Sequence, residues 1–217
     1  MNSFSRLFYL KAGFYSLIAV LFFSCSGENE LEVKIKSIPV NIQIDRFDLK
    51  FYNANPEEYI GLKKTYPYLF PAQYPDSIWI KRQRDSIQTL LHAEIKNIFP
   101  SLSPIKIDLE DLYKHIKYYF PKSLDPHVVT VVNNVDYQSK TVFTDSLLII
   151  SLDTYLGSKN PIYEGIPNYI VKDMELPYMM AHIVDELGNV VVKTPEDRTL
   201  IAQMIYYGKK LYIKDLL

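Results

Sequence analysis

The sequence is poor in cysteine and glycine and carries no excess of one charge. A single cysteine, Cys25, excludes a disulfide framework, a CxxC redox pair and a zinc site built from several cysteines. Seven glycines in 217 residues fit a packed, helix-rich domain better than a propeller or a glycine-punctuated barrel. The 24 basic and 25 acidic residues nearly balance, whereas nucleic-acid binders usually carry a basic surface. We therefore expect no nucleic-acid partner.

The chain also lacks a hydrophobic run long enough to span a membrane, although a shorter run lies near its start. Residues 12–23 are almost wholly apolar and follow the basic Arg6 and Lys11. The run has about 12 residues where a spanning helix needs about 20, which is typical of a signal-peptide core. The small residue Ser24 then precedes Cys25, as in a lipoprotein signal whose cysteine receives the lipid.

This pattern divides the chain into three parts. Residues 1–24 are predicted to be a lipoprotein signal peptide, 25–37 a lipidated polar tether, and 38–217 a single α+β domain. Several lipid chains on one cysteine anchor a protein durably. We expect an exported protein held at the cell membrane through lipid on Cys25 and facing the periplasm, with inner and outer membrane both open. An ordinary secretory signal with a chance cysteine is the alternative.

Apolar periodicity in the body of the chain indicates both helices and strands. Helices are expected from 55–58 to Tyr66, and over 76–99, 108–120, 161–172, 177–187 and 194 to the end. Strands are expected at 38–44, 127–132, 141–143 and 146–152. The second and third could pair as a hairpin, and the fourth reads as buried on both faces. The fold class is therefore α+β, with several helices around a small β-sheet.

The most suggestive chemical pattern is His182 with Glu186, four residues apart on one face of an expected helix. A zincin helix needs histidine at both positions and a glutamate general base directly after the first. Here Glu186 replaces the second histidine, and Ile183 stands where the base should be. We favour a polar pair on the helix face. No catalytic residue, metal site or cofactor is therefore predicted, and His182 and Glu186 are kept as alternative metal ligands.

The remaining polar and aromatic motifs favour structural roles. His92, His115 and His127 have no cysteine or histidine at ligand spacing, so surface or capping roles are expected. Asp153 reads as a polar group of a strand or loop. The nucleophile elbow of serine hydrolases does not occur, and neither a P-loop nor a GxGxxG supports nucleotide chemistry. The aromatic–proline runs 66–71 and 118–121 are read as core plugs at helix ends, with partner binding as the alternative.

Short motifs spread over residues 38–217 are specific in combination, although none is a catalytic signature. They are IDRFD at 44–48, YPYLFP at 66–71, YPDS at 74–77, HIKYYFP at 115–121, SLDTYLG at 151–157, YEGI at 163–166, DRT at 197–199 and AQMIYYGK at 202–209. Together they resemble the GldB family of gliding-motility lipoproteins of the Bacteroidetes.

The resemblance implies a cell-envelope lipoprotein needed for gliding motility and linked to the machinery that secretes and moves surface adhesins. Cys25 matches the family's lipidated position, so a palmitate-type modification is expected there. Family members are longer, which implies that the 38–217 domain is incomplete at its C-terminus. The resemblance also suggests a distant zincin-like fold in which the helix of His182 corresponds to a degraded HExxH helix.

Three functional hypotheses follow. The leading one is a non-enzymatic interaction or assembly component of the gliding and protein-secretion apparatus, whose partners are other envelope motility proteins. The second is a metallopeptidase-like hydrolase with a degenerate zinc site at His182 and Glu186. The third is a lipid-anchored solute-binding protein, which would need a cleft that the sequence does not reveal.

Overall fold

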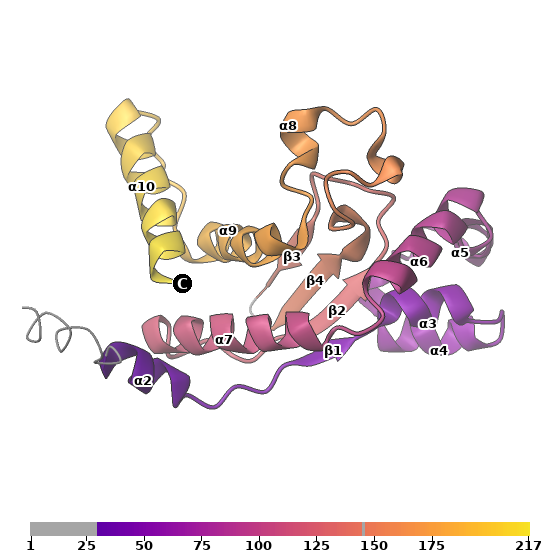
Figure 1. Ribbon diagram of the computed structural model, residues 1–217, viewed down its shortest axis with the longest axis horizontal. Helices are drawn as coiled ribbons and strands as arrows, with labels where there is room; N and C mark the ends of the chain where they lie inside the picture. Colours follow the sequence, from indigo (N-terminus) through magenta and orange to yellow (C-terminus); the bar gives the residue numbers. More distant parts are fainter. Residues whose placement is uncertain (1–29, 145) are drawn as a thin grey trace, which may run out of the picture. The chain divides into compact units, whose positions relative to one another are not determined.

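The computed structural model describes residues 30–144 and 146–217, so Cys25 and the expected signal peptide lie outside the described residues. The chain divides after Ile38 into two units. The described part of the first unit contains helix α2 (Glu30–Lys36), within the stretch expected to be the tether. The second unit, residues 39–217, contains the sheet and the other helices of the described chain (Figure 1).

A four-stranded mixed sheet lies at the centre of the second unit. Its strands are β1 (Gln43–Asp45), β2 (His127–Val131), β3 (Thr141–Phe143) and β4 (Leu147–Ser151), in the order β1-β2-β4-β3. β1, β2 and β4 are parallel, whereas β3 runs antiparallel to β4. The expected pairing of β2 with β3 is therefore wrong, because β4 lies between them. The loop from β2 to β3 must cross the carboxyl end of β4.

The helices confirm the α+β class. They are α3 (Phe47–Asn53), α4 (Glu58–Thr65), α5 (Asp76–Gln83), α6 (Ser86–Ile98), α7 (Ser103–Tyr119), α8 (Asn168–Val171), α9 (Met179–Val191) and α10 (Leu200–Leu216). Short 3-10 turns lie at Pro67–Leu69, Leu152–Thr154, Pro161–Tyr163 and Leu176–Tyr178. At α4, the Asn55 side chain accepts hydrogen bonds from the backbone N–H groups of Glu57 and Glu58, as its position before Pro56 suggested.

Three expected elements in the first half of the domain had wrong boundaries. The helix expected over 76–99 is two helices, because the Asp85 side chain accepts from the N–H of Ile87 and starts α6 anew. Helix α7 begins at Ser103 and not at 108, with Pro104 in its first turn, where a missing N–H costs nothing. The strand expected over 38–44 is reduced to β1.

Three expected helices in the second half also had different bounds. The segment 161–172 forms a 3-10 turn and the short α8, separated by Gly165 at φ +89°. Helix α9 begins at Met179 and extends to Val191, beyond the expected end at 187. Helix α10 begins at Leu200 and not at 194, because the Thr199 hydroxyl accepts from the N–H of Ala202 at 3.3 Å and caps the first turn.

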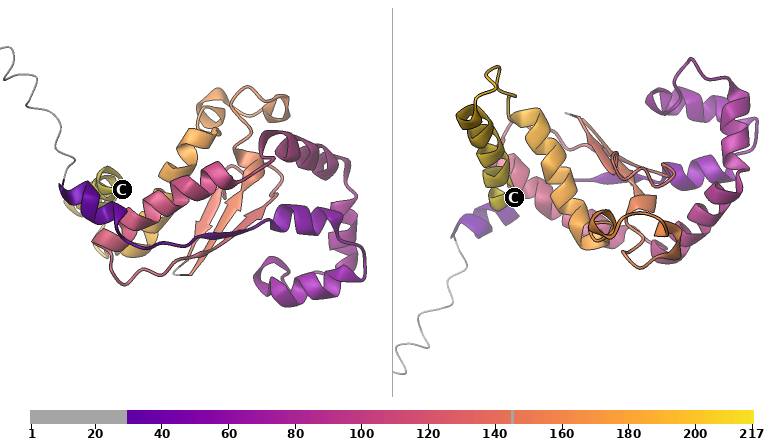
Figure 2. Two further views of the ribbon diagram at one scale, coloured as in Figure 1. Left: turned by 60° about the horizontal axis from the view of Figure 1, so that its bottom comes forward. Right: turned by 90° about the horizontal axis from the view of Figure 1, so that it is seen from above.

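The two faces of the sheet are covered differently (Figure 2). Helices α7 and α9 cover one face and bury Val128, Leu148 and Ile150 completely. The other face carries Val129 and Leu147 and meets an aromatic cluster from the segment 47–79. Leu147 and Ile149 on this side are half-buried, so the expectation that β4 is buried on both faces is wrong.

Candidate functional site

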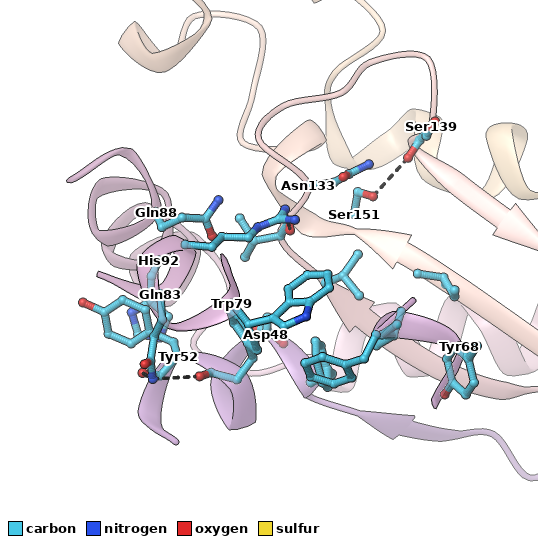
Figure 3. Close-up of a pocket in the computed structure, with 18 of the residues that line it drawn as sticks. Asp48, Tyr52, Tyr68, Trp79, Gln83, Gln88, His92, Asn133, Ser139 and Ser151 are labelled. Atoms are coloured by element: carbon cyan, nitrogen blue, oxygen red, sulfur yellow. Dashed lines mark hydrogen bonds between the residues drawn. The ribbon is translucent and has the colours of Figure 1, made fainter. Parts of the chain in front are cut away.

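A cavity of about 300 Å³ lies between the second face of the sheet and the helices α3, α5 and α6. Its wall is largely apolar, with Phe47, Phe51, Phe70 and Trp79 on the helical side and Val131, Val142 and Ile149 on the strand side. Figure 3 shows the indole of Trp79 projecting into the space between helices and strands. We call this space the aromatic cavity.

Two buried nitrogen atoms in the wall of the aromatic cavity have no hydrogen-bond partner among the residues that the structure describes. They are Trp79 Nε1 and His92 Nε2, on side chains that are more than nine-tenths buried. His92 was expected at the surface, but α6 turns it inward, where it stacks on Tyr52 with ring centroids 3.6 Å apart. Burial lowers the pKa of His92, so its ring is neutral at pH 7.

Arg82 adds a positive charge to this apolar wall. Its Nη2 donates to the carbonyl oxygen of Val132 at 3.1 Å. Within residues 30–144 and 146–217, no carboxylate lies within ion-pair distance of the guanidinium. Burial lowers the pKa of Arg82, and the negative charge of Asp153 opposes this effect. A guanidinium keeps its charge in proteins, so the wall holds an unpaired cation.

Next to the cavity, the segment Asp45–Asp48 joins the sheet to α3 through two ionic networks. The buried Asp48 carboxylate accepts from Arg46 Nη2 at 2.7 Å and from the Thr130 hydroxyl. Asp45 accepts from Lys50 and Tyr66. Burial acts to raise the pKa of Asp45, but the hydrogen bonds from Lys50 and Tyr66 outweigh it and the pKa is lowered. Asp48, the one acid among the described residues that line the cavity, is thus paired with Arg46 and forms no ion pair with Arg82.

The loop that crosses β4 is held by a buried carboxylate. Asp153 is completely buried and accepts from the backbone N–H groups of Asn133, at 3.0 Å, and Val135, at 2.7 Å. Asn134 and Val135 have φ of 54° and 56°, a left-handed conformation that is strained for a β-branched residue. Burial raises the pKa of Asp153, opposed by these N–H groups. From the sequence, Asp153 was expected only to be a polar group of a strand or loop.

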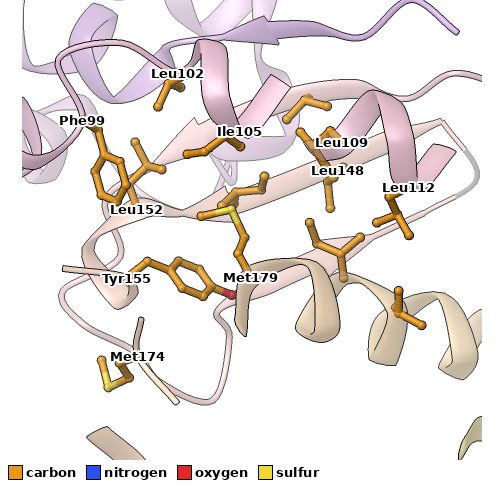
Figure 4. Packing of buried hydrophobic residues seen from close by; sticks show 14 of the residues in the cluster. Phe99, Leu102, Ile105, Leu109, Leu112, Leu148, Leu152, Tyr155, Met174 and Met179 are labelled. Atoms are coloured by element: carbon orange, nitrogen blue, oxygen red, sulfur yellow. The ribbon is translucent and has the colours of Figure 1, made fainter. Parts of the chain in front are cut away.

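His182 lies on α9, on the other side of the sheet from the aromatic cavity. It contacts Tyr155, which Figure 4 shows within the buried core. The Tyr155 hydroxyl is 3.0 Å from His182 Nδ1. The pKa of His182 is lowered to about 4, chiefly by burial. The positive charges of Lys140 and Lys214 also lower it, and the negative charges of Asp173 and Asp185 oppose this effect. The ring is neutral at pH 7, so Nδ1 can accept the hydroxyl proton.

Glu186, the second member of the expected pair, has a different partner. Its Oε2 accepts from Asn189 Nδ2 at 3.3 Å, one turn further along α9. In the described parts of the chain, no group of three or more histidine, cysteine, aspartate or glutamate side chains could hold a metal ion. The reading of His182 and Glu186 as a polar pair remains a prediction.

The other histidines and the aromatic–proline runs occupy mixed environments. His127 is exposed, as expected, with Nε2 3.5 Å from Asp45 Oδ2. In the first aromatic run, Tyr66 and Phe70 are buried in the core as predicted, whereas Tyr68 is 44% exposed and lines the aromatic cavity. In the second run, Tyr118 is exposed and Phe120 is half-buried.

Helix α10 presents a wide apolar face to solvent. Seven of its large apolar residues are more than half exposed: Leu200, Ile201, Met204, Ile205, Tyr207, Leu211 and Tyr212. The opposite side packs on its own domain: Ile213 is buried in the core, Lys214 Nζ pairs with Asp185 of α9 at 2.7 Å, and Lys210 Nζ donates to Asn189 of α9 at 2.6 Å. The described part of the domain therefore leaves a wide apolar face of α10 uncovered.

Across residues 30–144 and 146–217, every helix is either too short or too polar to cross a bilayer.

Fold and cavity together define a helix-rich α+β domain with no recognised catalytic constellation among its described residues. A family model described as gliding motility protein GldB matches residues 28–217. The chain therefore belongs to the GldB family of gliding-motility lipoproteins of the cell envelope, and the resemblance seen in its motifs is confirmed. No curated protein and no solved structure is significantly similar to the chain.

Proposed function

We propose that this protein is a membrane-anchored lipoprotein that acts without catalysis, as an interaction or assembly component of the gliding and protein-secretion apparatus. Lipid on Cys25 holds it at the membrane, facing the periplasm. Its partners are other envelope proteins of the motility machinery. Family membership supports the role in motility.

The exposed apolar face of α10 carries the proposal that the protein works by binding another protein. Leu200, Met204, Tyr207 and Leu211 follow one another at four- and three-residue spacing and so form one stripe. Contiguous apolar surface rimmed by polar residues marks sites of association. Aromatic residues and methionine, both present in this stripe, are enriched in protein interfaces.

The test is a complementation assay in a strain that lacks the gene. Three versions of the natural protein are expressed at equal levels and scored for colony spreading: Cys25→Ala, the triple change Leu200→Ser, Met204→Ser and Leu211→Ser, and the double change His182→Ala with Glu186→Ala. We expect the first two to abolish spreading and the third to retain it.

A matched control distinguishes loss of binding from loss of folding. The changes Lys209→Ser and Asp215→Ser alter exposed residues of the same helix without touching the apolar stripe, and should leave spreading intact. Cross-linking at α10 in cells should give an adduct with another envelope protein that the triple variant loses. Adducts within the chain alone, with normal spreading of the triple variant, would refute the interaction role.

The double variant tests the alternative of a metallopeptidase-like hydrolase. If it is stable, stays at the membrane and yet fails to spread, then His182 and Glu186 contribute chemistry or metal binding. Zinc analysis of the purified protein would then decide between these two roles, because a polar pair on α9 requires no metal.

A further inference from the structure

The aromatic cavity combines three features that the proposed interaction role does not explain. It has a mainly apolar wall, it holds a cation that forms no ion pair with the described residues, and it contains two buried nitrogen atoms without partners among those residues. Buried polar groups in proteins are nearly always hydrogen-bonded, so such groups in a cavity wall indicate a bound water or ligand. The volume of about 300 Å³ lies at the small end of the range for ligand pockets.

We propose that the aromatic cavity binds a small monocarboxylate with an apolar body, with the carboxylate near Arg82 and Trp79 Nε1 and the body against the aromatic and aliphatic wall. This inference is independent of the interaction role proposed for α10.

The donors in the wall select a negatively charged acceptor. Trp79 Nε1 is a donor only, so it needs an acceptor atom. Arg82 Nη2 donates to the carbonyl oxygen of Val132. The guanidinium has further N–H groups, arranged in a planar fork that matches a carboxylate. Asp48, the acid in the wall, is already bonded to Arg46 and Thr130, and Asp153, whose charge acts on Arg82, accepts from backbone N–H groups of the crossing loop. A carboxylate therefore supplies both an ion-pair partner for Arg82 and an acceptor for Trp79 Nε1.

The rest of the wall selects an apolar body. Phe47, Phe51 and Phe70 lie edge to face or tilted against one another, with ring centroids 5.6–6.2 Å apart, and form a firm aromatic floor. On the opposite side lie Val131, Val142 and Ile149 of the sheet. A carboxylate with this body occurs both in a medium-chain fatty acid and at the C-terminus of a peptide that ends in an apolar residue. The two sources share one chemistry, and the experiment separates them.

The reporter is built into the site, because Trp79 is the one tryptophan of the chain. The protein is purified from the cell envelope into lipid nanodiscs, and tryptophan emission is titrated with octanoate and, separately, with N-acetylphenylalanine. Octanol and N-acetylphenylalaninamide are the matched neutral probes. We expect a saturable change in emission with octanoate or with N-acetylphenylalanine, whichever acid fits the cavity. The neutral counterpart of that acid should bind at least tenfold more weakly. That factor corresponds to about 1.4 kcal/mol, the size of one hydrogen bond to a charged group.

Two variants complete the test. Arg82→Gln should bring the affinity for the acid down to that for its neutral counterpart, whereas Arg84→Gln, an exposed arginine outside the cavity wall, should change neither. If Arg82→Gln does not fold, Val142→Phe, which fills the cavity from the exposed strand β3, should abolish binding of both probes. Equal binding of acid and neutral probe would show a mere apolar space, and no saturable change with any probe would show a cavity that holds only water. Either result would overturn the proposal.

Discussion

The two faces of the sheet are built from the same strands, but one borders a closed core and the other borders the aromatic cavity. On β4, Leu148 and Ile150 point to the side covered by α7 and α9 and are completely buried. Ile149, between them in sequence, points to the aromatic cavity and is half-buried, and Val142 beside it on β3 is 44% exposed. Adjacent side chains of one strand thus face a closed core and an open cavity.

This difference separates stability from binding within one sheet. A closed face filled with aliphatic side chains provides most of the burial that opposes chain entropy. The open face keeps unsatisfied polar atoms and free volume, which cost stability and are retained where a site needs them. Changes on the closed side should therefore act on folding, and changes on the open side should act on binding.

The largest effect on stability is expected at Asp153, which holds the loop that crosses β4. Asp153→Ala leaves the half-buried Asn133 and Val135 without an acceptor for their N–H groups and releases the strained crossing loop. We expect a loss of about 4 kcal/mol in the free energy of unfolding, as for breaking a buried charge interaction. Urea denaturation measures it. A loss below about 1 kcal/mol would show that the loop holds its conformation without the carboxylate.

The sharpest comparison of the faces uses one residue type on one strand. Ile150→Ala should cost about 3 kcal/mol, because it opens a cavity in a sealed core. Ile149→Ala should cost about 1 kcal/mol, because it enlarges a space that already exists. The measurement is the difference in urea midpoint between the two variants. Equal losses would show that the second face is as tightly packed as the first.

A pH effect is expected on the closed side at His182. Its pKa in the folded protein is about 4, below the ordinary value of 6.5, so the unfolded chain binds the proton more readily. The contribution of this group is therefore complete above pH 6.5 and is lost as the pH falls toward 4. Because the ring is partly exposed, we expect a loss of about 1 to 2 kcal/mol. His182→Gln, which keeps an acceptor for Tyr155, should flatten the stability curve in this window; an unchanged curve contradicts the assignment.

The smallest effect is expected at the open edge. Val142→Thr keeps the shape and strand preference of the side chain at a position that is already 44% exposed. The free energy of unfolding should change by less than about 0.5 kcal/mol. Thermal unfolding of the two proteins side by side measures this. A larger loss would mean that the strand edge is covered in solution.

Sequence periodicity identified the elements that are locally encoded. The apolar runs at β2 and β4 and the capped start of α4 were found because each depends on neighbouring residues. The break between α5 and α6 was missed because Ile80 and Ile87, on either side of it, keep a seven-residue spacing. The pattern Asp85-Ser86, a cap followed by a first turn, was the signal that could have revealed it.

The pairing of the strands and the aromatic cavity were beyond local patterns. Nothing near Thr141 says that β3 pairs with β4 and not with β2, because that choice depends on a loop anchored by Asp153. Likewise Trp79, Arg82 and His92 come together only through the arrangement of α5 and α6 against the sheet. His92 was misplaced for the same reason, since a polar sequence around it hides its inward position.

The position of β4 has a consequence for the order of folding. It is the last of the four strands in the sequence, yet it stands between β2 and β3, and β1 pairs with a strand more than 80 residues away. Such long-range pairing is slow, and no hairpin can form a template before residues 147–151 are available. A chain delivered across a membrane from its N-terminus would present the aromatic side chains of α3 and α5 uncovered until then. Such uncovered aromatic side chains are prone to aggregation until β4 closes the sheet.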